Sequence, residues 1–291
     1  MKPAPFKYYS PTTLHEALEL VATLDNAKVL AGGQSLMPMM NFRFVMPDHL
    51  IDLNQIKEMA SIERRENCLF VGAMTRQRAL ETSPLAREFA PLIVEAYSHV
   101  SHRQIRNRGT YGGSLCHLDP SSEQPCFTAA LDGVIEVASR NGTRQIPMAE
   151  WTSMYMTPAL AEDELMTGAH LAIWPKGHGS AFFEYSRRHG DYAIVAVAVL
   201  ATVDASCRIT RLVISICGIS AGPVRLTTAE LELVGMEADE GAVVRAMSIA
   251  ESLDDVMEDA HNSADYRRHL VKVLTARAMR VAFQRARLGN K

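Results

Sequence analysis

The sequence predicts an α+β protein, in which a two-part α/β region precedes a C-terminal domain with a three-stranded antiparallel sheet and helices. In the first part, short apolar runs alternate with amphipathic helical patterns, as is typical of βαβ units. Beyond residue 180, three consecutive strand-like runs precede a helical remainder. Because 291 residues are many for one core, we expect three domains, over residues 1–56, 57–176 and 177–291.

The composition is ordinary for a globular protein, with 47% hydrophobic and 22% charged residues. A formal net charge of −3 argues against nucleic-acid binding, which normally requires a basic excess. No apolar run approaches the roughly 20 residues of a membrane span. Residues 1–5 lack the apolar segment of a signal peptide. We therefore expect a cytoplasmic protein that binds no nucleic acid and has no membrane span.

The five cysteines are widely spaced and form no C-x-x-C pair, so the sequence encodes neither a zinc ribbon nor an iron–sulfur motif. His99 and His102 lie three residues apart, but no third ligand is evident near them. We expect no metal site. The sequence also lacks a Ser/His/Asp order, a nucleophile elbow and a Walker lysine, so no catalytic residue is predicted.

The first unit is predicted to be β-α-β-α-β, ending near Ile56. Thr13–Glu16 has the pattern of a capping box that opens a helix. A strand over Val29–Ala31 follows, then a helix that Pro47 ends, then a strand over His49–Leu53.

Between the second strand and the second helix lies a Gly-Gly turn. Paired glycines let consecutive backbone N–H groups converge, and a helix start behind them favours a phosphate. A lone turn of this kind is more often a tight connection. The spacing does not fit G-x-G-x-x-G, so Asp52 is interpreted as the polar end of a strand. This first loop with its flanks comprises Leu30, Ala31, Gly32, Gly33, Gln34, Ser35 and Leu36.

The second unit is predicted to open with a strand over Cys68–Gly72 and a helix over Thr75–Glu81. One further helix is predicted from Ser83 to about Val100, with a continuous apolar stripe. The basic run Ser101–Arg108 then follows, and it is either a solvated face or a segment that lies close to a ligand or forms a docking edge.

A second glycine-rich loop, over 106–114, carries Thr110, Gly112, Gly113 and Ser114. Two loops of this chemistry suit a ligand with two phosphates, which is a dinucleotide. Asp119 and Glu123 follow, and their oxygens either accept from ribose hydroxyls or only cap the helix predicted over Pro125–Leu131.

The remaining elements are a hairpin around Asn141-Gly142, an edge strand over Glu164–Trp174 and a linker over 175–179. The C-terminal domain is predicted to contain strands over 181–187, 192–204 and 207–218, and helices over 227–233, 240–252 and 263–288. The last helix is expected to turn its arginines outward, namely Arg267, Arg268, Arg277, Arg280, Arg285 and Arg287.

Four motifs, in the same order, resemble the FAD-binding medium subunits of the molybdenum hydroxylases. These are the family of carbon monoxide dehydrogenase, xanthine dehydrogenase and the bacterial nicotine-type oxidoreductases. The motifs are Pro5–Leu14, Ala31–Leu36, Arg106–Ser114 with the following Asp119-Pro120, and Arg187–Ala193. The resemblance covers nearly the whole chain.

This resemblance implies that the two α/β parts form an FAD-binding domain, with the phosphates on Ala31–Ser35 and Thr110–Ser114. It places Glu123 where relatives use an acid, usually Asp, on the adenosine ribose. Leu165 and Tyr192 correspond to positions near the flavin, and Val100 completes the expected cofactor contacts. Many relatives carry lysine where this chain has Glu184, so that lysine's flavin contact is not expected here.

The resemblance also implies an electron-transfer subunit. A large subunit would hold molybdopterin, a small subunit would hold [2Fe-2S] clusters, and FAD would pass their electrons to an external acceptor. A dimer of heterotrimers is expected. Two alternatives stay open: a stand-alone flavin oxidoreductase, with His117 and Asp119 as its acid–base pair, and a non-redox nucleotide-binding module.

Overall fold

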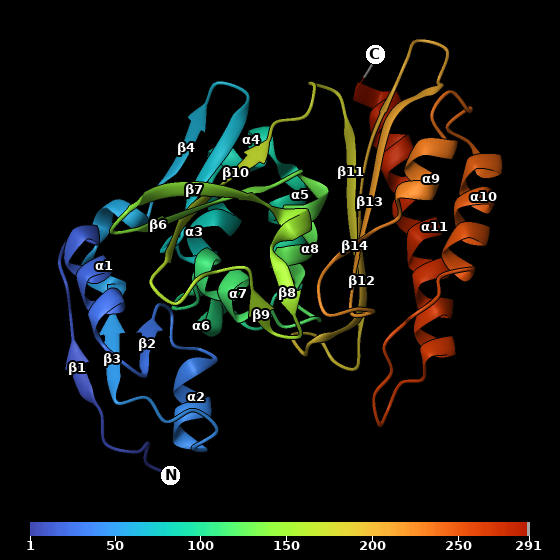
Figure 1. Ribbon diagram of the computed structural model, residues 1–291. Coiled ribbons are helices and arrows are strands. Elements are labelled where there is room, and N and C mark those ends of the chain that lie inside the picture. The colour runs from blue at the N-terminus through green and yellow to red at the C-terminus, as the bar shows by residue number, and fades with distance from the viewer. Residues whose placement is uncertain (290–291) are drawn as a thin grey trace.

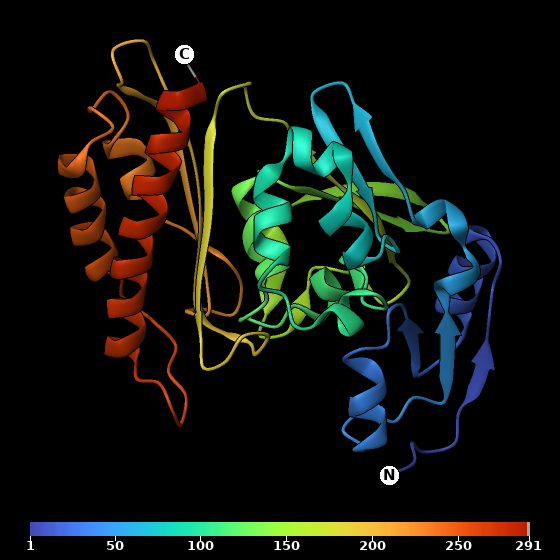
Figure 2. The same cartoon turned by 180° about the vertical axis from the view of Figure 1, so that it is seen from behind.

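The computed structural model describes residues 1–289, and Figure 1 shows three sheet-based units side by side. The middle unit lies between the N-terminal unit and the C-terminal sheet. A layer of helices covers the far face of that last sheet, as the view from behind in Figure 2 confirms. No helix within residues 1–289 combines the length and the apolarity needed to cross a membrane.

The N-terminal unit is a parallel sheet with strand order β1-β3-β2. Its elements confirm the predicted β-α-β-α-β unit: β1 (Lys7–Tyr9), α1 (Leu14–Thr23), β2 (Ala27–Leu30), α2 (Leu36–Asn41) and β3 (His49–Asp52). Thr13 caps α1 by accepting from the Glu16 amide. The Glu16 carboxylate accepts from the amide of Thr12, so the return half of the predicted capping box is displaced by one residue.

The middle unit is built on a five-stranded antiparallel sheet with order β4-β5-β10-β6-β7. Its strands are β4 (Ile62–Arg65), β5 (Cys68–Gly72), β6 (Val134–Ser139), β7 (Gly142–Pro147) and β10 (Leu165–Ala172), beside a short hairpin of β8 (Thr152–Met154) and β9 (Thr157–Pro158). The predicted hairpin at Asn141-Gly142 is confirmed. The edge placement of the strand near 164–174 is wrong, because β10 pairs with both β5 and β6. β4 was not predicted.

Six short helices accompany this sheet: α3 (Gln77–Thr82), α4 (Pro84–Phe89), α5 (Pro91–Tyr97), α6 (Arg103–Arg106), α7 (Tyr111–His117) and α8 (Glu123–Ala130). Three 3₁₀ turns, η1 (Leu53–Gln55), η2 (Lys57–Met59) and η3 (Met148–Glu150), complete the connections. The single helix predicted from Ser83 is in fact α4 and α5. Proline has no N–H to continue a helix, so Ala90 leaves the helical region and Pro91 starts a new one.

The C-terminal sheet has four antiparallel strands, not the predicted three: β11 (Gly179–Ser186), β12 (Ala193–Val203), β13 (Ile209–Cys217) and β14 (Val224–Arg225). β14 spans two residues, too few to show any periodicity in the sequence. Helices α9 (Thr227–Glu232), α10 (Glu240–Glu251) and α11 (Ala264–Gly289) confirm the three helical predictions.

Both faces of the C-terminal sheet are buried, which explains why β12 is a nearly continuous apolar run. Ala196, Ala198 and Leu200 pack into the core shared with the middle unit. Val197 and Val199, on the opposite face, pack against the helices. The C-terminal sheet therefore holds the helical layer on one side and the middle unit on the other.

One arginine of α11 does not point outward as predicted. Arg267 is only 7% exposed, and its guanidinium donates to the carbonyls of Ile194 and Gly218 and to the Asp259 carboxylate. These carbonyls lie where β12 begins and just after β13 ends, and a buried carbonyl requires a donor. The helical period alone could not reveal that requirement.

Candidate functional site

The first glycine loop connects β2 to α2 at the carboxyl edge of the parallel sheet, where ligands of α/β proteins commonly bind. Gly33 has a φ of +73°, a conformation that L side chains rarely adopt. In the described chain, no protein acceptor takes the amide N–H of Gly32, Gly33, Gln34 or Ser35. The loop therefore presents a run of free backbone donors, the arrangement suited to an anion.

The second glycine loop is shorter than predicted, because α7 begins at Tyr111 and includes both later glycines. Its backbone amides are engaged within the protein. Tyr111 and Gly112 donate to the carbonyls of Thr75 and Ala73 at 2.9 and 2.8 Å, and Gly113 donates to the Thr110 hydroxyl at 3.1 Å. The remaining polar groups of this loop are two hydroxyls: that of Thr110, which is 2% exposed and caps α7, and that of Ser114, which lies 2.9 Å from the Ser122 hydroxyl.

The two loops pack backbone against backbone. A Cβ placed on Gly32 would lie 2.5 Å from the Arg108 carbonyl oxygen and 2.7 Å from the Gly109 Cα. A Cβ placed on Gly113 would lie 3.4 Å from the Ala31 Cβ. Two turns that are far apart in the sequence thus form one continuous surface.

Two side chains that sequence analysis missed hold this contact together. The amide of Asn54 donates to the Ala31 carbonyl at 2.9 Å. The guanidinium of Arg76 donates to the Asn54 side chain at 2.5 Å and also to the Arg108 carbonyl. Asn54 lies two residues beyond the end of β3, at the same edge of the sheet where Ala31 follows β2, so a polar residue just after a parallel strand was a usable signal. No local pattern in the sequence pointed to a similar role for Arg76.

The basic run before the second loop has two different roles. Arg103 and Arg108 are exposed, as expected for a solvated face. Arg106 is 8% exposed, and its guanidinium binds the Glu81 carboxylate at 2.8 and 3.0 Å and the Val100 carbonyl at 2.7 Å. None of the interpretations of the run described Arg106, which is buried and joins the segment just before the second loop to α3 and to the Val100 and Ser101 carbonyls.

The acidic segment adjoins the second loop. The Ser122 and Ser114 hydroxyls lie 2.9 Å apart, and Ser122 is the N-cap of α8. The Asp119 carboxylate accepts from the Ser121 amide at 2.8 Å, which is a turn contact. Glu123 is 5% exposed. Burial raises its pKa to about 7, and the charge of Asp119 adds to that increase.

Tyr192 connects the C-terminal unit to the first loop through its contact with Ser35. It stands just before β12 and is 62% exposed, and its hydroxyl is within hydrogen-bonding reach of Ser35. Burial of the hydroxyl and the nearby carboxyls of Asp119 and Glu123 raise the pKa of Tyr192. Residues from all three units therefore converge on the two loops.

The other predicted cofactor contacts are apolar. Leu30 ends β2 and Leu36 begins α2, and both are half-buried beside the first loop. Val100 and Leu165 are buried in the hydrophobic core, at 6% and 3% exposure. Their contact with a flavin stays a prediction.

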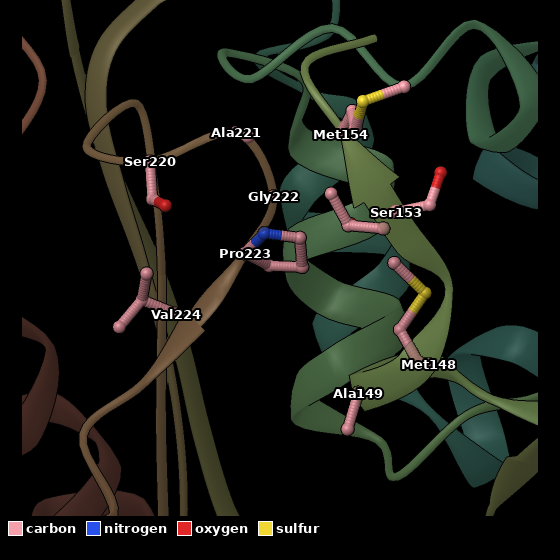
Figure 3. A pocket seen from close by; sticks show the side chains of 10 residues that line it. Met148, Ala149, Ser153, Met154, Ser220, Ala221, Gly222, Pro223 and Val224 are labelled. Atoms are coloured by element: carbon pink, nitrogen blue, oxygen red, sulfur yellow. The ribbon is translucent and has the colours of Figure 1, made fainter. Parts of the chain in front are cut away.

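A separate hollow of about 300 Å³ lies between the middle unit and the C-terminal sheet (Figure 3). Met148, Met154, Pro223 and Val224 line it, and Ser153 and Ser220 contribute hydroxyls. None of its lining residues is ionisable, and none belongs to either glycine loop.

The chain matches two known domain families. Residues 4–172 match the FAD binding domain in molybdopterin dehydrogenase, and residues 180–282 match the CO dehydrogenase flavoprotein C-terminal domain. The 6-hydroxypseudooxynicotine dehydrogenase complex subunit alpha of Paenarthrobacter nicotinovorans is 36% identical over 99% of this chain and 97% of the relative. The carbon monoxide dehydrogenase medium chain of Hydrogenophaga pseudoflava is 32% identical over 98% of this chain and 99% of the relative.

The fold matches as well. The solved structure of quinoline 2-oxidoreductase from Pseudomonas putida 86 contains a chain that superposes with a TM-score of 0.94 at 32% identity, covering 99% of this chain and 100% of that one. The resemblance carried by the four sequence motifs is thereby confirmed. This chain belongs to the FAD-binding subunits of the molybdenum hydroxylases, which are multi-subunit oxidoreductases.

Proposed function

We propose that this chain binds FAD where its two glycine loops meet and relays electrons through it. The observation that carries the proposal is the contact of Gly32 with the backbone of Arg108 and Gly109. It makes one surface that a single diphosphate can span. The proposed contacts are Leu30, Ala31, Gly32, Gly33, Gln34, Ser35, Leu36, Val100, Thr110, Gly112, Gly113, Ser114, Glu123, Leu165 and Tyr192.

The donor set fits this ligand. The free amides of 32–35 suit a phosphate, and the hydroxyls of Thr110 and Ser114 add further donors. The buried carboxyl of Glu123 is an acceptor for ribose hydroxyls. Tyr192 is an exposed aromatic ring beside the first loop, so it suits contact with a planar ligand.

FAD supplies the redox chemistry when it is bound, and the protein binds it, orients it and shields it from water. No general base is required of this chain. The candidate acid–base pair, His117 and Asp119, is poorly suited to one: burial lowers the pKa of His117, and the Asp119 carboxylate is engaged by the Ser121 amide. The comparisons do not favour a stand-alone oxidoreductase or a non-redox module.

The proposed assembly follows the family. Electrons would come from [2Fe-2S] clusters on a small subunit, after oxidation of a substrate at molybdopterin on a large subunit, and would leave to an external acceptor. The absence of C-x-x-C spacing agrees with clusters held by another chain. We further propose a cytoplasmic dimer of heterotrimers, with residues 1–56 and 57–176 as the halves of the FAD-binding domain and 177–291 as the C-terminal domain.

Purification of the chain with its associated subunits tests this function. We expect a yellow complex that releases FAD on denaturation, with molybdenum and iron on the other chains. A chain that takes up no flavin under any reconstitution would exclude the proposal. A bound nucleotide without visible flavin absorption would instead indicate a non-redox module, and turnover by the isolated chain would indicate a stand-alone oxidoreductase.

A further inference from the structure

Two carboxyl groups from different units meet beside the proposed FAD site. Glu123 is the first residue of α8 in the middle unit, and Glu184 lies on β11 of the C-terminal sheet. Glu123 is buried, and within residues 1–289 no N–H or O–H donor reaches the buried Oε2 atom of Glu184. The two side chains are within hydrogen-bonding reach of each other. Two carboxylates this close cannot both stay ionised without a strong repulsion.

The surroundings do not neutralise this pair. The groups that act on it are Asp119, Arg106, Tyr97, Tyr192, Cys126, Cys217 and the Ser186 hydroxyl. Arg106 is the one cation among these described groups, and the Glu81 carboxylate already binds it at two positions. Of the two carboxyls, Glu123 is also stabilised as an anion by its own backbone amide at the start of α8, so one negative charge is compensated and the other carboxyl keeps a proton.

The direction of the hydrogen bond places that proton. Burial raises the pKa of Glu123 to about 7 and that of Glu184 to about 8. Glu123 begins α8, where its own backbone amide and the helix N-terminus favour the ionised form, whereas no donor reaches the buried Glu184 Oε2 atom within residues 1–289. The neutral carboxyl is therefore Glu184, and it donates to Glu123. The free oxygen of Glu123 then faces a proposed ligand as an acceptor.

Building on the proposed FAD site, we propose that Glu184 is a positioning residue. Its neutral carboxyl donates a hydrogen bond to the Glu123 carboxylate and holds it toward the ribose hydroxyls of FAD. In this chain a shared proton has that role, so FAD binding becomes linked to pH.

The protonation of the two carboxyls determines whether FAD affinity rises or falls with pH. As pH rises above about 8, the shared proton leaves, and two adjacent anions repel each other and the FAD diphosphate. Binding FAD then requires uptake of one proton, so affinity should fall by roughly tenfold per pH unit in that range. Without FAD, the folded protein holds these protons more tightly than the unfolded chain, whose glutamates titrate near pH 4.3. The free energy of unfolding should therefore fall as pH rises from about 4.3 to about 8.

The test is a titration of the flavin-depleted complex with FAD between pH 6 and 9.5, followed by flavin fluorescence. The variants are Glu184→Gln, which always donates and cannot ionise, and the control Glu240→Gln, an exposed residue paired with Arg280 on the outer helices. We expect Glu184→Gln to bind within about threefold of the parent at pH 7.5 and to lose the alkaline fall. Glu240→Gln should follow the parent.

A second measurement and a second variant distinguish a direct effect on FAD binding from misfolding of Glu184→Gln. Calorimetry in two buffers of different ionisation enthalpy at pH 8.5 should detect about one proton taken up per FAD by the parent and none by Glu184→Gln. Glu184→Lys should also bind FAD without an alkaline fall, because its ammonium replaces the proton.

The outcomes separate this inference from the proposed function. Equal pH slopes in the parent and in Glu184→Gln would overturn the role of Glu184 while FAD binding stands. Loss of FAD at every pH in both variants, with unchanged unfolding curves, would also overturn it, because Glu184 would then act on FAD as an anion. No FAD binding by the parent at any pH would instead refute the proposed function itself.

Discussion

The two glycine loops look alike in sequence, yet they contribute to the site in different ways. The first loop leaves the amides of residues 32–35 without protein acceptors, whereas the amides at the start of α7 bond to Ala73, Thr75 and Thr110. The first loop is therefore the part that we propose binds the anion through its backbone. The second loop has its amides bonded within the protein and contributes hydroxyls. Its backbone packs against Gly32 and so fixes the position of the first loop.

The difference shows that glycine has two separate uses here. Gly33 needs its positive φ so that the loop amides turn toward one side. Gly32 needs the absence of a Cβ, since the backbone of the second loop occupies that space. Four substitutions test how the two loops differ and how they are held together, from the largest expected effect to the smallest.

Removing the support of the second loop should have the largest effect, on stability. Arg106→Ala removes the two-point ion pair with the mostly buried Glu81 carboxylate and the donor to the Val100 carbonyl, and it leaves Glu81 only its more exposed pair with Arg78. Breaking a buried pair in this way should cost about 3 kcal/mol in the free energy of unfolding. Urea unfolding of the flavin-depleted protein measures this. Arg78→Ala is the matched control, because its more exposed ion pair with the same Glu81 should contribute about 0.5 kcal/mol. Equal losses would show that Arg106 gives no special support.

Forcing the loops apart should mainly weaken FAD binding. Gly32→Ala introduces a Cβ against the Arg108 carbonyl, and overpacking of this kind costs about 1–3 kcal/mol, or roughly 5- to 150-fold in affinity. Equilibrium titration with FAD measures the change. Gly241→Ala, at the start of α10 and far from both loops in sequence, should bind FAD like the parent. Unchanged affinity in Gly32→Ala would contradict the idea that contact between the loops shapes the site.

Removing the clamp between the loops should have an intermediate effect. Arg76→Ala loses the bonds to Asn54 and to the Arg108 carbonyl, and hydrogen bonds from a charged group contribute about 1.5–3 kcal/mol. We expect at least a tenfold loss of FAD affinity in the same titration. The exposed Arg87 on α4 provides the control, as Arg87→Ala. The clamp has no role if both variants bind equally.

The smallest effect is expected at the start of α7. Thr110→Val removes the hydroxyl that accepts from the Gly113 amide, and losing such a cap costs about 1 kcal/mol in the free energy of unfolding. Thr110→Ser keeps the hydroxyl and should stay close to the parent. Thermal unfolding distinguishes the two variants. A stable Thr110→Val protein would show that the second loop does not depend on its cap.

Much of the fold could be predicted from local patterns. The parallel first unit, the Asn141-Gly142 hairpin and the C-terminal helices each carry a turn, a cap or a period within a few residues. The errors have both local and distant causes. Pro91 ends a helix that the apolar stripe continues, and β14 is too short to show a pattern. Arg267 is buried because its guanidinium donates to two carbonyls at the ends of β12 and β13, and the sequence of the helix alone does not reveal these partners.

The sequence by itself determined the family, the two glycine loops and the identity of the residues within them, because short motifs encode local backbone geometry. Only the tertiary structure decided that Gly32 packs against Arg108, that Asn54 and Arg76 join the loops, and that Glu123 meets Glu184. These contacts join residues distant in the chain. Their free energy depends on burial and on the space left between units, and neither quantity exists until the chain has folded.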